Sequence, residues 1–346
     1  MLEIDGARYS GSGAIVRQAF AYAALTGKPI RVFNARSRRP RPGLRPQHIR
    51  VIESIRELVS GSAEGVRQGS TEIVFRPGKP SFNRRYVWDI GSAGSTTALA
   101  LALLPVIAFA SEPVEIELQG GLFQDFAPSY FHLKLVIMPL LQRMGIETDL
   151  EMVRPGYVPR GQGILHLGIR PAKSALRPLV METPSSVARL WGIALSSHLE
   201  ERKVSDRMAE AAKKILSRAG YQAEIEIVYE NKAVQPGAAL AAFADLTGGA
   251  RLGADLAGAP GRRSEAIGRD VARQLLAELS AEATLDRHAS DQIIPFASLA
   301  SGESRFAIAG LTDHVQSAAW LSSEFLGADV RTDGRLLVIR GIGYRP

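Results

Sequence analysis

Helical and strand-like periodicities alternate along this chain, and the alternation limits the folds that it can adopt. A helix followed by two strands recurs at intervals of roughly 45–60 residues. The expected helices cover 14–27, 46–61, 95–110 and 129–144, and the expected strands cover 29–35, 70–78, 84–91, 112–121, 146–156 and 163–171. The units share no sequence identity, so the repetition is weak. It predicts a layered α/β fold with helices on one face of mixed sheets.

The regular order of one helix followed by two strands ends at about residue 178. One long amphipathic helix is expected at 200–220 and one clear strand at 223–230, followed by a Gly/Ala-rich stretch at 236–261. We interpret 178–276 as a small α/β domain inserted into a core domain made of 1–177 and 277–346. In the last part, a helix resumes at 268 and the chain closes with a strand at 334–343.

Composition excludes several classes of protein. The chain has 346 residues, of which 46% are hydrophobic and 22% are charged, as in ordinary globular domains. It contains no cysteine, which excludes disulfides, thiolate nucleophiles and zinc–thiolate sites. The first residues carry acids and no apolar core of a signal peptide, and the longest apolar stretch, 96–110, is too short and proline-broken to span a bilayer. We therefore expect a cytoplasmic protein without a membrane partner.

Basic charge is concentrated in one segment. The net charge is +7, and residues 31–50 contain seven arginines and no acid. Such a run is either a solvated surface or an anion-binding patch. Three prolines stiffen it, and arginine forks suit phosphate oxygens, which favours a nucleotide or nucleic-acid partner.

Two glycine/serine turns precede expected helices, at 5–13 and 89–95. Each could present backbone N–H groups to an anion, or could simply be a tight turn with a helix cap. Neither forms a Walker motif or a dinucleotide fingerprint, so both interpretations stay open.

The histidines supply few catalytic signals. Four of the six lie in periodic segments and are expected to be structural or superficial: His48, His132, His166 and His198. His288 lies near Asp291, where a functional role and a solvated helix end compete evenly. His314 is either a reactive nitrogen displayed at a strand-to-helix turn or a helix-capping polar residue. No nucleophile elbow accompanies them.

Several segments, taken in order, resemble the RNA 3'-terminal phosphate cyclase family. They are "RPGLRPQH" (41–48), "GSAGS" (91–95), "APSY" (127–130), "RPGYVPRGQG" (154–163), "DQIIPFASLASG" (291–302), "LTDHVQSA" (311–318) and "IRGIG" (339–343). The resemblance spans nearly the whole chain and is weakest across 178–276. It implies three helix-strand-strand repeats like those of the enolpyruvyl transferases, with a small α/β module inserted before the last repeat.

The resemblance also implies an activity and a site. Family enzymes use ATP and a divalent metal (Mg or Mn) to convert an RNA 3'-phosphate into a 2',3'-cyclic phosphate through a histidyl-AMP intermediate. The matching nucleophile is His314. The positions matching nucleotide-binding residues are Pro128, His288, Asp291 and Gln292, and those matching phosphate-binding residues are Arg17, Arg36, Arg39 and Gln47. The metal ligands and the oligomeric state remain unassigned.

Four positions depart from the family pattern. Ser10 and Ala14 replace a glutamate associated with the metal and a glutamine one turn later. Leu101 replaces another glutamine, and Phe123 stands where a polar or acidic residue is usual. These departures leave an alternative open: a catalytically impaired, cyclase-like RNA-binding protein in RNA processing or ribosome assembly.

Overall fold

The computed structural model describes residues 1–345, and its first repeat has the order β-α-β-α-β-β. The elements are β1 (Leu2–Asp5), α1 (Gly13–Thr26), β2 (Ile30–Phe33), α2 (Pro46–Leu58), β3 (Ser62–Glu64) and β4 (Ile73–Arg76). The strands form a sheet in the order β1-β2-β4-β3. β1 is parallel to β2, and the other two pairs are antiparallel.

The second repeat has the same topology. Its elements are β5 (Arg85–Asp89), α3 (Thr96–Ile107), β6 (Val114–Gly120), α4 (Tyr130–His132), the π-helical turn η1 (Leu133–Ile137), α5 (Met138–Met144), β7 (Glu147–Arg154) and β8 (Gly163–Arg170). The sheet order is β5-β6-β8-β7, with β5 parallel to β6. The helix predicted at 129–144 is therefore one segment interrupted by a π turn.

The third repeat is split by the inserted unit. It comprises β9 (Val180–Met181), α8 (Arg287–Leu299), β14 (Ser301–Ala307), α9 (Asp313–Leu326), β15 (Asp329–Asp333) and β16 (Leu336–Ile342). Its sheet order, β9-β14-β16-β15, matches the other two. The insertion thus follows the first strand of the third repeat, not the end of the second. Because β9 has only two residues, its periodicity could not be recognised in the sequence.

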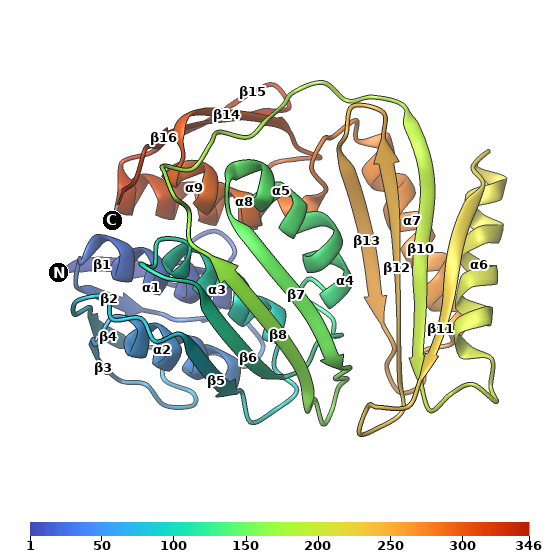
Figure 1. Ribbon diagram of the computed structural model, residues 1–346, viewed down its shortest axis with the longest axis horizontal. Coiled ribbons are helices and arrows are strands. Elements are labelled where there is room, and N and C mark those ends of the chain that lie inside the picture. The colour runs from blue at the N-terminus through green and yellow to red at the C-terminus, as the bar shows by residue number, and fades with distance from the viewer. Residues whose placement is uncertain (346) are drawn as a thin grey trace.

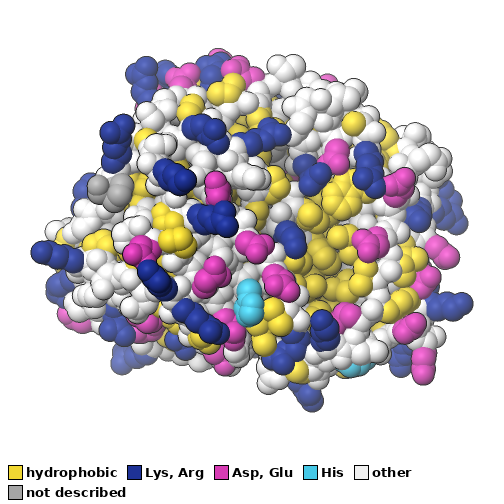
Figure 2. Space-filling view, in the orientation of Figure 1, with side chains coloured by type: hydrophobic (Ala, Val, Ile, Leu, Met, Phe, Trp, Pro, Cys, Tyr) yellow, Lys and Arg dark blue, Asp and Glu magenta, His cyan; other side chains and the backbone are white. Residues whose placement is uncertain are grey.

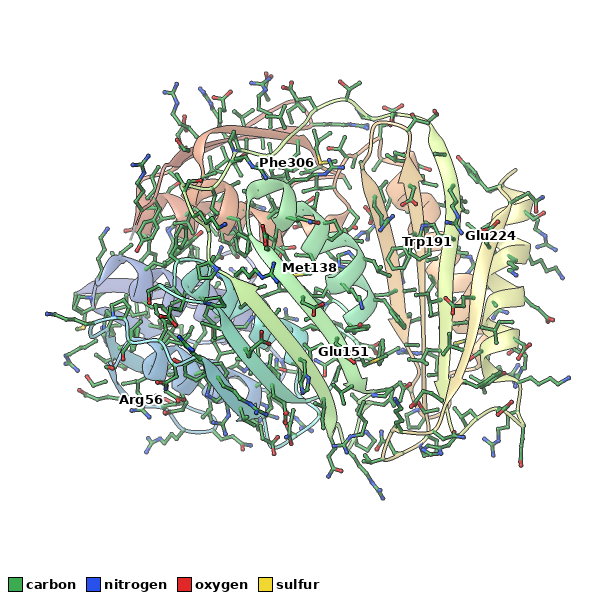
Figure 3. The ribbon with its side chains drawn as sticks, viewed as in Figure 1. Arg56, Met138, Glu151, Trp191, Glu224 and Phe306 are labelled. Atoms are coloured by element: carbon green, nitrogen blue, oxygen red, sulfur yellow. The ribbon has the colours of Figure 1, made fainter. Side chains whose placement is uncertain are left out.

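The core places helices inside and sheets outside (Figure 1). α1 packs against α3 and α9, and α9 packs against α8. Since α3 is surrounded by other elements, all of its residues are buried, which explains its uniformly apolar sequence. Figure 3 shows Met138 of α5 and Phe306 of β14 toward the interior, whereas Arg56 of α2 points outward.

The inserted unit contains more strands than the sequence suggested. Its elements are β10 (Val187–Ser197), α6 (Val204–Arg218), β11 (Ala223–Glu230), β12 (Gly237–Leu246), β13 (Arg251–Ala257) and α7 (Ser264–Ser280). The sheet order is β11-β10-β12-β13, and Trp191 of β10 lies beside Glu224 of β11 (Figure 3). The prediction of a single clear strand was wrong here, because the Gly/Ala-rich stretch forms β12 and β13 and residues 187–197 form β10.

The contacts also bear on the domain boundaries. β9 pairs with β14 in the third core sheet, and α7 packs against β12, β13 and α6 of the inserted unit. The limits of 178 and 276 stay a prediction, and these contacts favour an inserted unit of 187–280.

Side chains at the start of four helices cap the backbone around one region of the core. Ser12 caps α1 and Ser95 caps α3, each accepting a backbone N–H of its own first turn. Asp286 caps α8 and Thr312 caps α9. Both glycine/serine turns therefore contain helix caps. No helix among residues 1–345 is long and apolar enough to cross a membrane.

Candidate active site

His314 lies in the first turn of α9, at the edge of a cleft between α1, α3, α8 and α9. Thr312, not His314, caps this helix by accepting the Val315 N–H. The imidazole is therefore free of a capping role, and its side chain is 42% exposed. This geometry favours the interpretation of His314 as a displayed reactive nitrogen.

Asp291 faces His314 across the cleft from α8. One carboxylate oxygen lies 4.0 Å from His314 Nδ1, too far for a direct hydrogen bond. The Gln292 amide donates to the same carboxylate at 2.6 Å. Burial raises the pKa of Asp291 to about 7, although nearby Arg17 opposes this.

The protonation state of His314 suits a nucleophile. Burial lowers its pKa, and the positive charges of Arg17 and Arg39 lower it further. Its place at a helix N-terminus acts in the same direction, because the helix dipole disfavours a cation there. The imidazole is therefore neutral at neutral pH and keeps a lone pair available.

Arg17 of α1 is the central cation of the cleft. Among residues 1–345, its side chain has no hydrogen-bond acceptor and no carboxylate within ion-pair distance, although it is half-buried. Burial lowers its pKa to about 10, with smaller contributions from the charges of Arg36 and Arg39 and an opposing effect of Asp291. A partly desolvated guanidinium without a partner is a strong anion site.

The predicted phosphate-binding side chains differ in what they contact. Arg36 donates to the backbone oxygens of Arg41 and Gly43, so it partly stabilises its own loop. The Arg39 side chain has no hydrogen bond or ion pair in the described part of the chain and is free for a ligand. Gln47 accepts the Ser95 N–H at 3.0 Å, which joins the start of α2 to the start of α3.

His48 is structural in this arrangement. It is buried in the first turn of α2, and its Nδ1 accepts the Arg45 N–H. Burial, together with Arg17 and Arg36, holds its pKa well below the usual value. A Cβ at Gly13 would lie only 2.0 Å from His48 Nε2, so α1 must begin with glycine to approach this ring.

A buried ion pair joins the two segments that carry Pro128 and His288. His132 of α4 contacts Asp286, the cap of α8, at 3.0 Å, with both side chains almost fully buried. Pro128 lies just before α4, and its carbonyl accepts the Thr97 hydroxyl at 2.6 Å. His288, the second residue of α8, lies edge-on to His132. The pair was missed from sequence, although an aspartate before α8 is a cap signal.

Three of the four departures from the family pattern gather at the cleft. Ser10 bonds to Ser317, one turn after His314 on α9, and Ala14 and Leu101 line the cleft wall. Phe123 instead packs in the core against Tyr157. The space inside this cleft is narrow, about 40 Å³, which suits water rather than a nucleotide.

The residues present do not fit a protein-held metal ion. Among residues 1–345, no three acidic or histidine side chains gather at a distance suitable for one ion. Asp5, the acid of the first glycine turn, already accepts hydrogen bonds from Ala7 and Asn34.

Comparison with known proteins identifies the family. The profile of the family described as RNA 3'-terminal phosphate cyclase matches residues 8–332. A protein of that name from Methanopyrus kandleri is 38% identical over 340 residues, covering 97% of this chain and 96% of that protein. Another, from Archaeoglobus fulgidus, is 35% identical over 342 residues, covering 98% of this chain and 100% of that protein.

Among solved structures, the enolpyruvyl transferase NikO from Streptomyces tendae aligns with 12% identity and a TM-score of 0.43, covering 100% of this chain and 50% of that one. The similarity in sequence extends over nearly the whole chain, and the chain belongs to the RNA 3'-terminal phosphate cyclase family.

Proposed function

We propose that this protein uses ATP to convert an RNA 3'-phosphate into a 2',3'-cyclic phosphate through a histidyl-AMP intermediate. The observation that carries the proposal is a neutral, partly exposed His314 at a cleft that also contains the unpaired Arg17. The full-length similarity to proteins named as cyclases supports the same reaction.

The reaction proceeds by two transfers and a ring closure. Because Nδ1 of His314 faces Asp291, Nε2 is the nitrogen that attacks the α-phosphorus of ATP. A nitrogen–phosphorus bond forms, and pyrophosphate leaves with the electrons of the broken bond. The RNA 3'-phosphate then displaces His314 and takes the adenylyl group. Finally the adjacent 2'-hydroxyl attacks that 3'-phosphorus, loses its proton and releases AMP.

The cationic side chains stabilise the charge that develops on the phosphates. The positive charge of Arg17 acts on His314, and Arg39 adds a second free guanidinium. Arg36 and Gln47 hold the loops that surround them and keep donors for a phosphate. Pro128, His288, Asp291 and Gln292 lie on the two segments joined by the His132–Asp286 pair, where the nucleoside would bind.

We also propose that the divalent metal, Mg or Mn, arrives with the phosphates of ATP. This follows from the lack of a suitable cluster of ligands in the described part of the chain. The cytoplasmic setting expected from the sequence stays a prediction.

The first test is covalent labelling. The purified protein is incubated with ATP labelled at the α-phosphate and then separated on a denaturing gel. Label on the protein supports an adenylyl-transfer enzyme. Absence of label across several divalent metals, with RNA still bound, would favour the impaired RNA-binding alternative.

Arg39→Lys should slow labelling by about one to two decades. Lysine keeps the charge but cannot provide a bidentate fork, and a lost bond to a charged oxygen costs roughly 1.5–3 kcal/mol. Initial labelling rates at saturating ATP measure the effect. Arg67→Lys, an exposed arginine outside the cleft, is the matched control. Equal labelling rates for Arg39→Lys and the parent would mean that Arg39 belongs to a solvated surface and does not bind a phosphate.

Ser10→Glu should lower the metal concentration needed for half-maximal labelling. A carboxylate is a better ligand than a hydroxyl for a hard divalent cation, and Ser10 contacts the helix that carries His314. A metal titration of the labelling rate tests this, with the exposed Ser174→Glu as a control for added charge. Loss of labelling with ATP still bound would show that this loop serves another purpose.

A further inference from the structure

A second, larger cleft lies between the core and the inserted unit. Its volume is about 700 Å³, within the range of ligand-binding clefts. The turn between β7 and β8 forms one wall. The other is formed by the segments that follow β10 and β13, the start of β12 and the starts of α6 and α7. At the lower edge of Figure 2, below the ends of β8 and β10, basic and hydrophobic side chains lie next to each other.

The lining of this cleft is strongly basic. It contains five arginines and, among residues 1–345, no aspartate or glutamate: Arg160, Arg202, Arg207, Arg262 and Arg263. Two of them have partners, because Arg207 pairs with Glu265 and Arg262 with Asp125. The other three, Arg160, Arg202 and Arg263, have no carboxylate within 4.0 Å in the described part of the chain. This charge pattern suits a polyanion.

The floor of the cleft is held by direct hydrogen bonds between its two walls. The Gln235 amide donates to the backbone oxygens of Tyr157 and Val158, and it accepts from the Arg160 N–H. The Tyr157 hydroxyl bonds to Ser197 of β10 at 2.9 Å. The cleft is therefore formed before any ligand binds.

A fully exposed aromatic ring stands beside this cleft. Phe126 is 100% exposed, and its φ of 67° is unusual for a bulky residue. The neighbouring Asp125 accepts two hydrogen bonds from Arg262, at 3.0 and 2.8 Å, which fixes the loop to the rim. Two residues further along is Pro128, in the segment assigned to the nucleotide. Phe126 thus belongs to a short segment that is anchored to the rim of the basic cleft at Asp125 and leads to Pro128.

We infer that this cleft binds the single-stranded RNA that precedes the 3'-phosphate, with a base stacked on Phe126. Arginines hold the backbone phosphates, and an exposed ring offers a platform to any unpaired base. The bases of a duplex are already stacked on one another, so a single strand fits better. The inference rests on the proposed function, since the bound end must reach His314.

The sharpest test compares long and short substrates. Phe126→Ala should raise the KM for a 3'-phosphorylated oligonucleotide by roughly 5- to 150-fold, as expected for loss of one stacked base. The KM for a nucleoside 3'-phosphate, which cannot reach the cleft, should not change. Phe126→Trp should restore the parental KM and Phe126→Leu should not, because leucine is apolar but has no ring.

The arginines are tested by salt dependence. Affinity for the oligonucleotide is measured by fluorescence anisotropy at several salt concentrations. The triple change Arg160→Ser, Arg202→Ser and Arg263→Ser should reduce the slope of log affinity against log salt by roughly 2, at about 0.7 per phosphate contact. Arg218→Ser, at the far end of α6 and outside the cleft, should leave the slope unchanged.

Self-labelling with ATP separates this inference from the proposed function. The cleft variants should label as fast as the parent, because none of the altered residues lies at His314. If the parent labels and cyclises but the variants keep parental KM and salt slope, the cleft inference is overturned alone. If the parent never labels, yet binds RNA through these side chains, the proposed function fails, and only the assignment of the cleft as a single-stranded RNA site stands.

Discussion

His314→Ala is expected to abolish covalent labelling by α-labelled ATP, because alanine has no nitrogen to form the adenylate. ATP binding should stay within a few-fold of the parent, since the phosphate and nucleoside contacts come from other residues. In the parent, the linkage should be labile in acid and comparatively stable in alkali, as a phosphoramidate is. Because burial and nearby arginines lower the pKa of His314, labelling should be lost at a lower pH than expected for a histidine in water.

The matched control is His166→Ala. His166 is a similarly exposed histidine on β8 that contacts Glu117 and lies outside the cleft. It should label like the parent. Continued uptake of label by His314→Ala would assign the nucleophile elsewhere and remove the basis of the proposed mechanism.

The sequence predicted the core helices well because their apolar residues repeat at helical spacing. α2 illustrates this, with buried Ile52, Ile55 and Leu58 on one face. β12 was not recognised for the opposite reason. Most of its residues are buried, so hydrophobicity does not alternate, and its alanines have little preference for strands. Its pairing with β10 and β13 makes it a strand.

At the site too, the sequence did not predict which residues lie close together, as Asp291 and His314 show. Neither periodicity nor spacing predicts that contact, which depends on how α8 packs against α9. Resemblance to the family selected both positions, but it could not reveal their separation or the buried surroundings that shift their pKa values. The Ser10–Ser317 contact likewise joins residues 307 positions apart. Such long-range pairs require the folded chain.

His132 and Asp286 lie 154 positions apart in the sequence, and their ion pair connects three parts of the fold. Asp286 accepts hydrogen bonds from His132, from the N–H groups of His288 and Ala289, and from the Gly253 N–H of the inserted unit. Burial disfavours charge on both partners, yet their mutual attraction outweighs it. It raises the pKa of His132 to about 9 and lowers that of Asp286 to about 2.

Asp286→Ala should therefore reduce the free energy of unfolding by about 3–5 kcal/mol, as for other broken buried pairs. His132→Phe should cost less, because Asp286 would keep its three backbone donors and the unpartnered His132 Nδ1 would be removed. Urea unfolding followed by circular dichroism measures both, provided that the slope of the transition is unchanged. Asp329→Ala, an exposed aspartate on β15, should stay within about 0.5 kcal/mol of the parent.

The effect of Asp286→Ala should depend on pH in a defined direction. The contribution of Asp286 is present above its ordinary pKa of 3.8 and is lost as pH falls toward 2. That of His132 is complete below 6.5 and is lost as pH rises through 9. The difference between parent and Asp286→Ala should thus be largest between pH 3.8 and 6.5 and shrink on either side. If the difference in the free energy of unfolding were constant from acid to alkaline pH, the charge of Asp286 would not contribute to stability. Asp286 would then act only as a helix cap, and the charged pair would not hold α4 against α8.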